Sequence, residues 1–161
     1  MKNKSVVWMT QAAMIAAIYV VLTLIFAPFG FGEVQVRIAE SLTILPFFTS
    51  AAIPGLFVGC LIGNMISGAI LPDILFGSLA TLIGACFTFL LRKQHRLWAP
   101  LPPIVANTVV IPLVLRYAYG INLPIPLMMC TIGLGEILSC GVLGMILLSS
   151  LQKYQHKLFK Y

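Results

Sequence analysis

The sequence has very little charge. Only 9% of its 161 residues are charged and four are acidic, whereas 60% are hydrophobic. A soluble globular domain carries charge on about a quarter of its residues. With a mean hydropathy of +1.04, the composition excludes an ordinary soluble domain. Long apolar runs separated by short polar breaks predict an all-α integral membrane protein.

Several kinds of chemical site are missing as well. There is no CxxC pair, no clustered histidine, no Ser/His/Asp set and no glycine-rich phosphate motif. We therefore predict no catalytic residues, no metal site and no cofactor bound by this chain. The cysteines are scattered in apolar segments and are predicted to be small buried hydrophobes: Cys60, Cys86, Cys130 and Cys140.

The apolar runs predict six transmembrane helices in a single domain over residues 1–161. A membrane helix needs about 20 residues, and the second run reaches that length only if it begins near Arg37. Prolines at 46, 54 and 72 mark kinks or helix ends. The expected helices are about 6–28, 37–50, 54–70, 74–92, 100–118 and 126–151. The first run shows no small-residue cleavage site, so no cleavable signal peptide is expected.

The net charge of +6 is explained by orientation in a membrane and not by a nucleic-acid partner. In a six-helix topology, eight of the ten basic residues lie on one side. The positive-inside rule assigns this side to the cytoplasm, which predicts cytoplasmic termini in a plasma-membrane protein. The eight residues are Lys2, Lys4, Arg92, Lys93, Arg96, Lys153, Lys157 and Lys160.

Small residues repeat at helical spacing in two segments. Such a stripe lets another helix come close, although alanine is also common in membrane helices for no special reason. The third expected helix has a similar stripe at residues 55, 59 and 63. The alanines of the first helix that we predict to dock on a partner are Ala12, Ala13, Ala16 and Ala17.

Residues 33–40 hold three of the chain's few charges between two apolar segments. If helical, Glu33 and Arg37 are spaced i, i+4, and Arg37 and Glu40 are spaced i, i+3, so they could form local ion pairs. Arg37 and Arg116 are the two basic residues expected on the outer side, so Arg37 is not an orientation signal. We predict a lid over a site, with some of its charges contacting ligand and others tying the loop to the next helix.

Polar groups from other segments are expected in the same outer half. Glu136 lies about ten residues into the last helix, and an ionisable group at that depth is costly unless it is paired or faces water. The alternative is a structural pair between Glu136 and Arg116. For Asp73 the alternative is helix capping, and for Glu33 it is a solvated loop.

This convergence predicts a binding site for a flat, hydrogen-bonding heterocycle. The predicted substrate-binding residues are Glu33, Arg37, Glu40, Asp73, Asn107, Arg116, Tyr117 and Glu136, with Phe29 and Phe31 as stacking or lid residues.

Several motifs in a fixed order resemble the QueT family over nearly the whole chain. They are Glu-Val-Gln-Val-Arg-Ile-Ala-Glu at 33–40, Leu-Pro-Phe-Phe at 45–48, Ala-Ile-Pro-Gly-Leu-Phe-Val-Gly at 52–59, Ile-Leu-Pro-Asp-Ile-Leu-Phe-Gly-Ser-Leu-Ala-Thr at 70–81 and Gly-Leu-Gly-Glu at 133–136. The resemblance implies the substrate-binding S component of an energy-coupling factor (ECF) transporter for queuosine precursors, which are 7-deazaguanine compounds. It also implies six helices and an outward-facing site closed by the first outer loop.

The resemblance further implies a transmembrane coupling subunit, on which the alanine face of the first helix docks, and two ATPase subunits that use ATP. For the ligand, we expect Glu136 or Glu40 to accept hydrogen bonds from its guanidine-like edge. Asn107 and Arg116 are expected at the carbonyl edge.

The remaining candidate residues are expected to contact the ring of the ligand or a substituent on it. Phe29, Phe31 or Tyr117 would stack on it, and Glu33 or Asp73 would be free to pair with an aminomethyl group. Three alternatives stay open at this point: an S component for another vitamin, a self-sufficient small secondary transporter or channel, and an intramembrane enzyme, for which no catalytic set is present.

Overall fold

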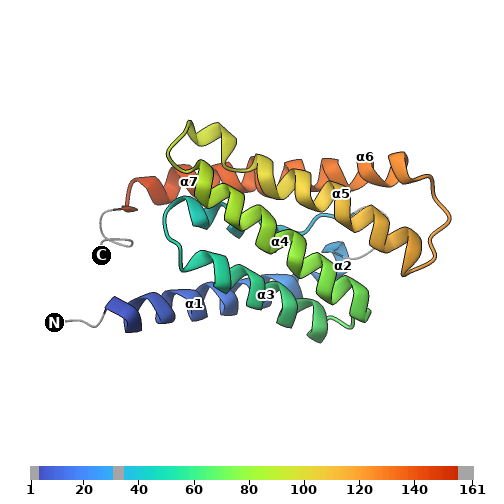
Figure 1. Cartoon of the computed structure of the whole chain (residues 1–161), viewed down its shortest axis with the longest axis horizontal. Coiled ribbons are helices and arrows are strands. Elements are labelled where there is room, and N and C mark those ends of the chain that lie inside the picture. Colours follow the sequence, from blue (N-terminus) through green and yellow to red (C-terminus); the bar gives the residue numbers. More distant parts are fainter. Residues whose placement is uncertain (1–3, 31–34, 156–161) are drawn as a thin grey trace.

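A computed structural model describes residues 4–30 and 35–155 of the chain, and within these ranges it contains helices and connections but no strand (Figure 1). The elements are α1 (Lys4–Ile25), α2 (Ala27–Gly30), η1 (Ile38–Phe47), α3 (Ala52–Ile66), α4 (Leu71–Leu91), η2 (Arg96–Trp98), α5 (Leu101–Tyr117), α6 (Ile125–Glu136), η3 (Ile137–Leu143) and α7 (Gly144–Gln152). The long predicted helices coincide with observed ones to within a few residues.

Four helical segments are long and apolar enough to cross a membrane. They are Lys4–Ile25, Leu71–Leu91, Arg96–Tyr117 and Ile125–Gln152, and the shorter apolar helices are Ile38–Phe47 and Ala52–Ile66. The all-α, multi-pass membrane protein predicted from composition is thus confirmed.

The helices form an elongated bundle around η1. Helix α1 packs on α3, α3 on α4, α4 on α5 and α5 on α6, while η1 contacts α1, α4, η3 and α7. Residues 39–46 of η1 are all buried. The segment that reached the length of a membrane helix only with added residues is therefore at the centre of the fold.

The second predicted helix differs in type from our expectation, because η1 is a 3₁₀-helix of ten residues rather than an α-helix over 37–50. Pro46 cannot donate a backbone hydrogen bond, which weakens an α-helical ladder near the end of the element. A 3₁₀-helix rises about 2.0 Å per residue, against about 1.5 Å for an α-helix. The ten residues of η1 therefore extend further than ten residues of an α-helix would.

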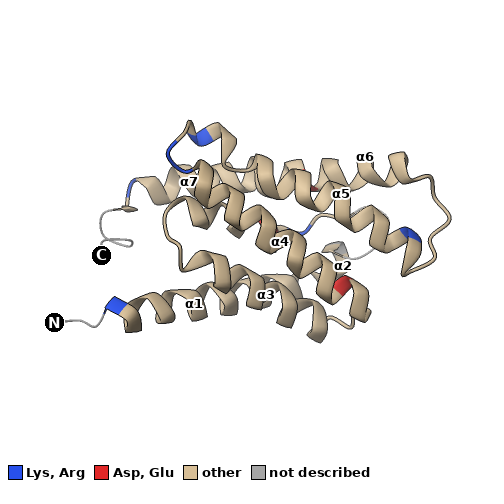
Figure 2. Cartoon of the chain, in the orientation of Figure 1, with Lys and Arg blue, Asp and Glu red and all other residues tan. Residues whose placement is uncertain are grey.

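Basic residues gather at one end of the bundle (Figure 2). The start of α1, the connection between α4 and α5 and the residues after α7 all lie at this end, and together they carry Lys4, Arg92, Lys93, Arg96 and Lys153. The start of α4 and the end of α5 lie at the opposite end. The charge asymmetry predicted from the sequence is therefore present along the long axis of the described structure.

Glycines of α3 let α1 approach closely. A Cβ atom at Gly59 would lie 2.8 Å from the Cβ of Tyr19 and 3.0 Å from the carbonyl oxygen of Ala16. Similarly, a Cβ at Gly55 would lie 2.7 Å from the carbonyl oxygen of Ala12. The predicted packing face of this helix is confirmed, and its neighbour is α1.

The alanines of α1 divide into two pairs. Ala12 and Ala16 are half-buried with their backbone against α3, whereas Ala13 and Ala17 are exposed. Only the second pair is fully on the outer surface of this chain, and the docking of this face on a partner stays a prediction.

Replacing Gly59 by alanine is expected to destabilise the fold by about 1–3 kcal/mol, because the added methyl group forces α1 and α3 apart. The matched control is Gly141→Ala, since the nearest atom to a Cβ there lies 3.7 Å away, at ordinary contact distance. Thermal unfolding of both variants in the same detergent measures the difference. Equal unfolding temperatures would contradict the close α1–α3 contact.

Candidate functional site

Glu40 is a completely buried carboxylate in the first turn of η1. The Tyr19 hydroxyl of α1 donates a hydrogen bond to its Oε1 atom. The Thr81 hydroxyl of α4 donates to the same oxygen at 3.2 Å. The other oxygen, Oε2, has no hydrogen-bond partner among the described residues. One carboxylate therefore joins three elements and keeps an unused acceptor in the interior.

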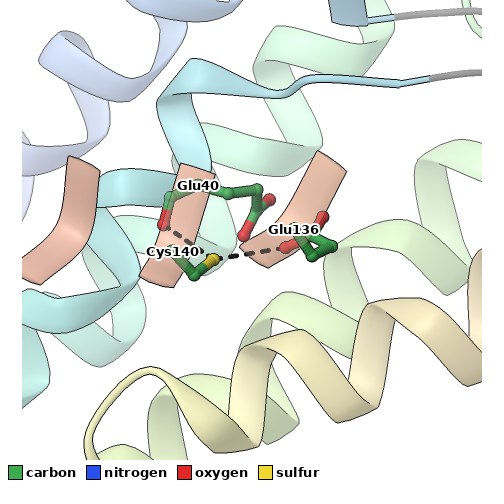
Figure 3. Close-up of side chains that lie close together, drawn as sticks. All are labelled: Glu40, Glu136 and Cys140. Carbon is green, nitrogen blue, oxygen red and sulfur yellow. Dashed lines mark hydrogen bonds between the residues drawn. The ribbon is translucent and has the colours of Figure 1, made fainter. Parts of the chain in front are cut away.

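Glu136, the last residue of α6, is a second buried carboxylate, with 4% of its surface exposed. The Asn107 side-chain amide of α5 donates to its Oε1 at 3.1 Å. The Cys140 thiol donates to Oε2 at 3.2 Å and lies 3.3 Å from the backbone carbonyl oxygen of Glu40. Figure 3 shows Cys140 bridging the two glutamates, which come from elements far apart in the sequence.

The helix changes form directly after Glu136. Residues Ile137–Leu143 are π-helical within one continuous helical stretch from Ile125 to Gln152. Short π-helical turns occur frequently at functional sites, because they change which side chains face inward. Ser139 and Cys140 are both buried in this segment.

Cys140 is a member of the site that the sequence analysis did not select. The expectation that the cysteines are buried is confirmed for Cys60 and Cys140, but it is wrong for Cys130, which is exposed, and for Cys86, which is half-buried. The i, i+4 spacing of Glu136 and Cys140 was the available signal. It is weak by itself, since any two residues one turn apart share it.

Arg37 lies beside the glutamates and is also buried. Its Nη2 atom is 3.7 Å from Asp73 Oδ1. Its Nε atom donates to Gln35 Oε1 at 3.0 Å and to the carbonyl oxygen of Gly30 at 3.3 Å. The ion pair between Arg37 and Asp73 of α4 was not expected from the sequence, and the local pair between Arg37 and Glu40 stays a prediction. The residues before Gln35 that complete the predicted lid, Phe31 and Glu33, lie outside the described residues.

Asp73 does not cap α4, in contrast to the alternative considered from the sequence. It lies in the first turn and makes no capping bond. Instead, Tyr119 donates its hydroxyl to Asp73 Oδ2 at 3.0 Å. Burial raises the pKa of Tyr119, and the nearby Asp73 carboxylate raises it further, so this hydroxyl stays protonated and remains a donor at neutral pH. Asp73 thereby links the 35–37 segment, α4 and the loop after α5.

The segment of residues 35–37 lies directly on α6 next to Glu136. A Cβ atom at Gly135 would be only 1.7 Å from the carbonyl oxygen of Gln35. Gln35 itself is 4% exposed. Only glycine at 135 allows this backbone-to-backbone approach, so the identity of this residue decides whether the segment can cover the site.

A small cavity of about 20 Å³ lies under this segment. Tyr19, Arg37 and Asn64 contribute its polar lining, with apolar atoms from α1 and η1. Tyr19 both lines the cavity and bonds to Glu40. This volume holds about one water molecule, so a larger ligand requires the 35–37 segment or a helix to move.

Two predicted site residues are not brought to this cluster. Arg116 donates to the carbonyl oxygen of Ile121 and to Asn122 Oδ1, both at 3.2 Å, and so ties the loop between α5 and α6. Tyr117 is 77% exposed. The alternative pairing of Glu136 with Arg116 is also wrong, since Asn107 and Cys140 are the partners of that carboxylate. The backbone of Phe29 is described in α2, but its side chain is outside the described structure.

The cluster also has donor atoms of the kind that bind metal ions. One ligand atom each from Glu40, Glu136 and Cys140 lie within 4.8 Å of one another. Two carboxylates and a thiol can hold a borderline divalent cation such as Zn²⁺. No metal site was predicted from the sequence, because these residues show no recognisable ligand spacing along the chain.

Long apolar helices around a buried polar cluster define a multi-pass membrane protein. The family model described as QueT transporter matches residues 9–153. The chain therefore belongs to the QueT transporter family, as its motifs indicated.

Among curated proteins, the queuosine precursor transporter QueT of Lactococcus lactis subsp. cremoris (strain MG1363) is 32% identical over 85 residues. The aligned part covers 52% of this chain and 50% of that protein. The match thus spans about half the length of the relative. No solved structure matches the chain.

Proposed function

We propose that the protein is the substrate-binding S component of an ECF-type importer and captures a queuosine precursor, a 7-deazaguanine-type base, from outside the cell. The observation that carries this proposal is the buried Glu40–Glu136 cluster beneath the 35–37 segment in a chain of the QueT transporter family. The related protein from Lactococcus lactis is named for queuosine precursors, which supports this ligand class.

The chemistry of the cluster suits a ligand rich in N–H groups. A carboxylate offers two acceptor oxygens, and bonds to a charged acceptor are about twice as strong as neutral ones. A 7-deazaguanine presents a ring N–H and an exocyclic amine on one edge. Glu40 has one oxygen without a hydrogen-bond partner, and Asn107 lies beside Glu136 to contact a second polar group of the ligand.

We further propose six membrane crossings within a single S-component domain, with both termini in the cytoplasm. The basic residues at one end of the bundle support this orientation through the positive-inside rule. The start of α4, with Asp73, then faces outward. The two shorter apolar helices would complete the crossings together with the extended residues before η1.

In this proposal the chain binds no cofactor, and partners supply the energy. The sequence has no phosphate-binding motif, so two ATPase subunits would hydrolyse ATP and a transmembrane coupling subunit would join them to this chain. The exposed Ala13 and Ala17 of α1 offer a flat surface to that subunit.

The ligand class can be tested by thermal unfolding of the purified chain with a panel of compounds. We expect 7-deazaguanine derivatives to raise the unfolding temperature, whereas thiamine, riboflavin and biotin leave it unchanged. Stabilisation by one of these vitamins alone would assign the site to another substrate.

Dependence on partners is tested separately in proteoliposomes. We expect uptake of a labelled 7-deazaguanine only when the coupling and ATPase subunits are present with ATP. Uptake by this chain alone would instead identify a self-sufficient transporter, although the ligand class would stand.

A further inference from the structure

A large apolar groove lies between α1 and α7, away from the Glu40–Glu136 cluster. Its volume is about 560 Å³. Both helices pack on η1, and the buried side chains of Leu42 and Leu45 from η1 form part of its floor. The walls include Val7, Met14 and Ile18 of α1 and Leu147 and Leu151 of α7. Since Met14 is 58% exposed, the groove is open to the surroundings of the bundle, which in a membrane are lipid.

The groove is about as long as one membrane leaflet is thick. Val7 and Ile18 are separated by 18 − 7 = 11 residues of α1. At a rise of about 1.5 Å per residue this is roughly 16 Å. The hydrocarbon core of a bilayer is about 30 Å thick, so one leaflet contributes about 15 Å. The groove therefore matches the length of one phospholipid acyl chain.

Exposed aromatic side chains mark one end of the groove as the end near the membrane surface. Trp8 follows Val7 directly and is 41% exposed. Trp98 in η2 and Tyr154 after α7 are also exposed, and their elements lie at the same end of the bundle as the start of α1 (Figure 1). Trp and Tyr are enriched at the level of the lipid headgroups. A phospholipid with a chain in the groove therefore has its headgroup at this end.

The charges at this end favour an anionic headgroup. Lys4 is exposed and precedes Val7 by three residues, which places both on one face of α1. Lys153 is exposed and directly follows α7. Basic sites between membrane helices bind anionic lipid headgroups. No exposed carboxylate in the described part of the chain opposes this attraction, because the acidic residues there are all buried: Glu40, Asp73 and Glu136.

We infer that the groove between α1 and α7 binds an anionic phospholipid, with one acyl chain along the groove and the phosphate beside Lys4 and Lys153. This lipid is not the transported compound, so the inference goes beyond the proposed function and does not depend on the identity of the substrate. A phospholipid without net charge fits the same groove but gains nothing from the two lysines.

The test compares two lipids with identical acyl chains. Native mass spectrometry of the full chain in detergent is used to titrate palmitoyl-oleoyl phosphatidylglycerol, which is anionic, and palmitoyl-oleoyl phosphatidylcholine, which has no net charge. We expect about 10- to 30-fold tighter binding of phosphatidylglycerol, because two lysines attract its headgroup. The double variant Lys4→Gln with Lys153→Gln is expected to lose most of this preference.

A second double variant separates a local site from general attraction. Lys93→Gln with Arg96→Gln removes two charges at the same end of the bundle, but neither residue lines the groove. This control is expected to keep the preference for phosphatidylglycerol. Equal losses in the two double variants would overturn the inference, since the attraction would then come from the whole basic end.

The groove itself is tested by a matched pair of methionine variants. Met14→Trp fills the groove, whereas Met9→Trp adds the same bulk to another exposed methionine of α1 that does not line it. We expect Met14→Trp alone to weaken the binding of both lipids several-fold, with both variants keeping the unfolding temperature of the original chain.

The other outcomes each decide the matter. Equal binding of the two lipids by the original chain would overturn the inference, as would equal lipid binding by the two methionine variants. If Met14→Trp keeps its lipid but no longer assembles with the coupling subunit, the groove holds a helix of that subunit and the inference fails. None of these results bears on which compound is transported, so the proposed function is tested independently.

Discussion

Under the proposed function, the Glu136→Gln variant is expected to bind a 7-deazaguanine ligand about 10- to 100-fold more weakly than the original chain, because one of the two carboxylates proposed to bind the ligand loses its charge. The same variant is expected to be more stable without ligand, by about 1 kcal/mol or more, since one of two neighbouring buried carboxylates has been replaced by a neutral group. Binding and stability should therefore move in opposite directions.

Opposite changes in affinity and stability distinguish a ligand-binding role of Glu136 from a purely structural role. If Glu136 only held helices together, its replacement would lower both affinity and unfolding temperature. Thermal unfolding with and without ligand, together with titration of the ligand, gives both quantities from one preparation. Full affinity in Glu136→Gln would rule out the assignment of this residue to the site.

The Gly135→Ala variant is expected to have the largest effect of any glycine-to-alanine change among the described residues, because its added methyl group would make the shortest contact. The added atom would lie 1.7 Å from the carbonyl oxygen of Gln35, so residues 35–37 must leave their position on α6. Arg37, which lies in that segment, would lose its contact with Asp73. We expect a destabilisation of about 1–3 kcal/mol or more and loss of detectable ligand binding.

Gly133→Ala is the matched control for this variant. A Cβ there meets the Thr108 side chain at 3.4 Å, which is ordinary contact. Both substitutions lie in α6 and bring the same gain in helix propensity, about 1 kcal/mol, so their difference isolates the contact with Gln35. If the two variants bind ligand equally well, residues 35–37 do not lie on α6 as described.

Hydropathy was enough to predict most of the architecture. Membrane helices are specified by the composition of contiguous segments, because each must satisfy its backbone hydrogen bonds internally and present apolar side chains to lipid. The same local logic identified Glu136 as a candidate, since a charge inside an apolar segment is costly wherever the segment ends up. The glycine stripe of α3 was also readable from spacing alone.

Hydropathy could not predict the form of η1. The ten residues Ile38–Phe47 are apolar enough for an α-helix, but they lie in the centre of the bundle as a 3₁₀-helix. Their geometry follows from the space left by α1, α4 and α7, together with the constraint of Pro46. Such constraints come from neighbours that are distant along the chain.

Contacts between segments distant along the chain also decided which residues belong to the candidate site. The sequence by itself determined a membrane bundle with one carboxylate inside it and further acidic residues toward one end. Only the tertiary structure decided that Tyr19, Thr81 and Cys140 are their partners, and that Arg116 and Tyr117 are not. The physical reason is that the cost of burying a charge can be read from one segment, whereas the hydrogen bonds that offset it come from four or five segments that meet only after folding.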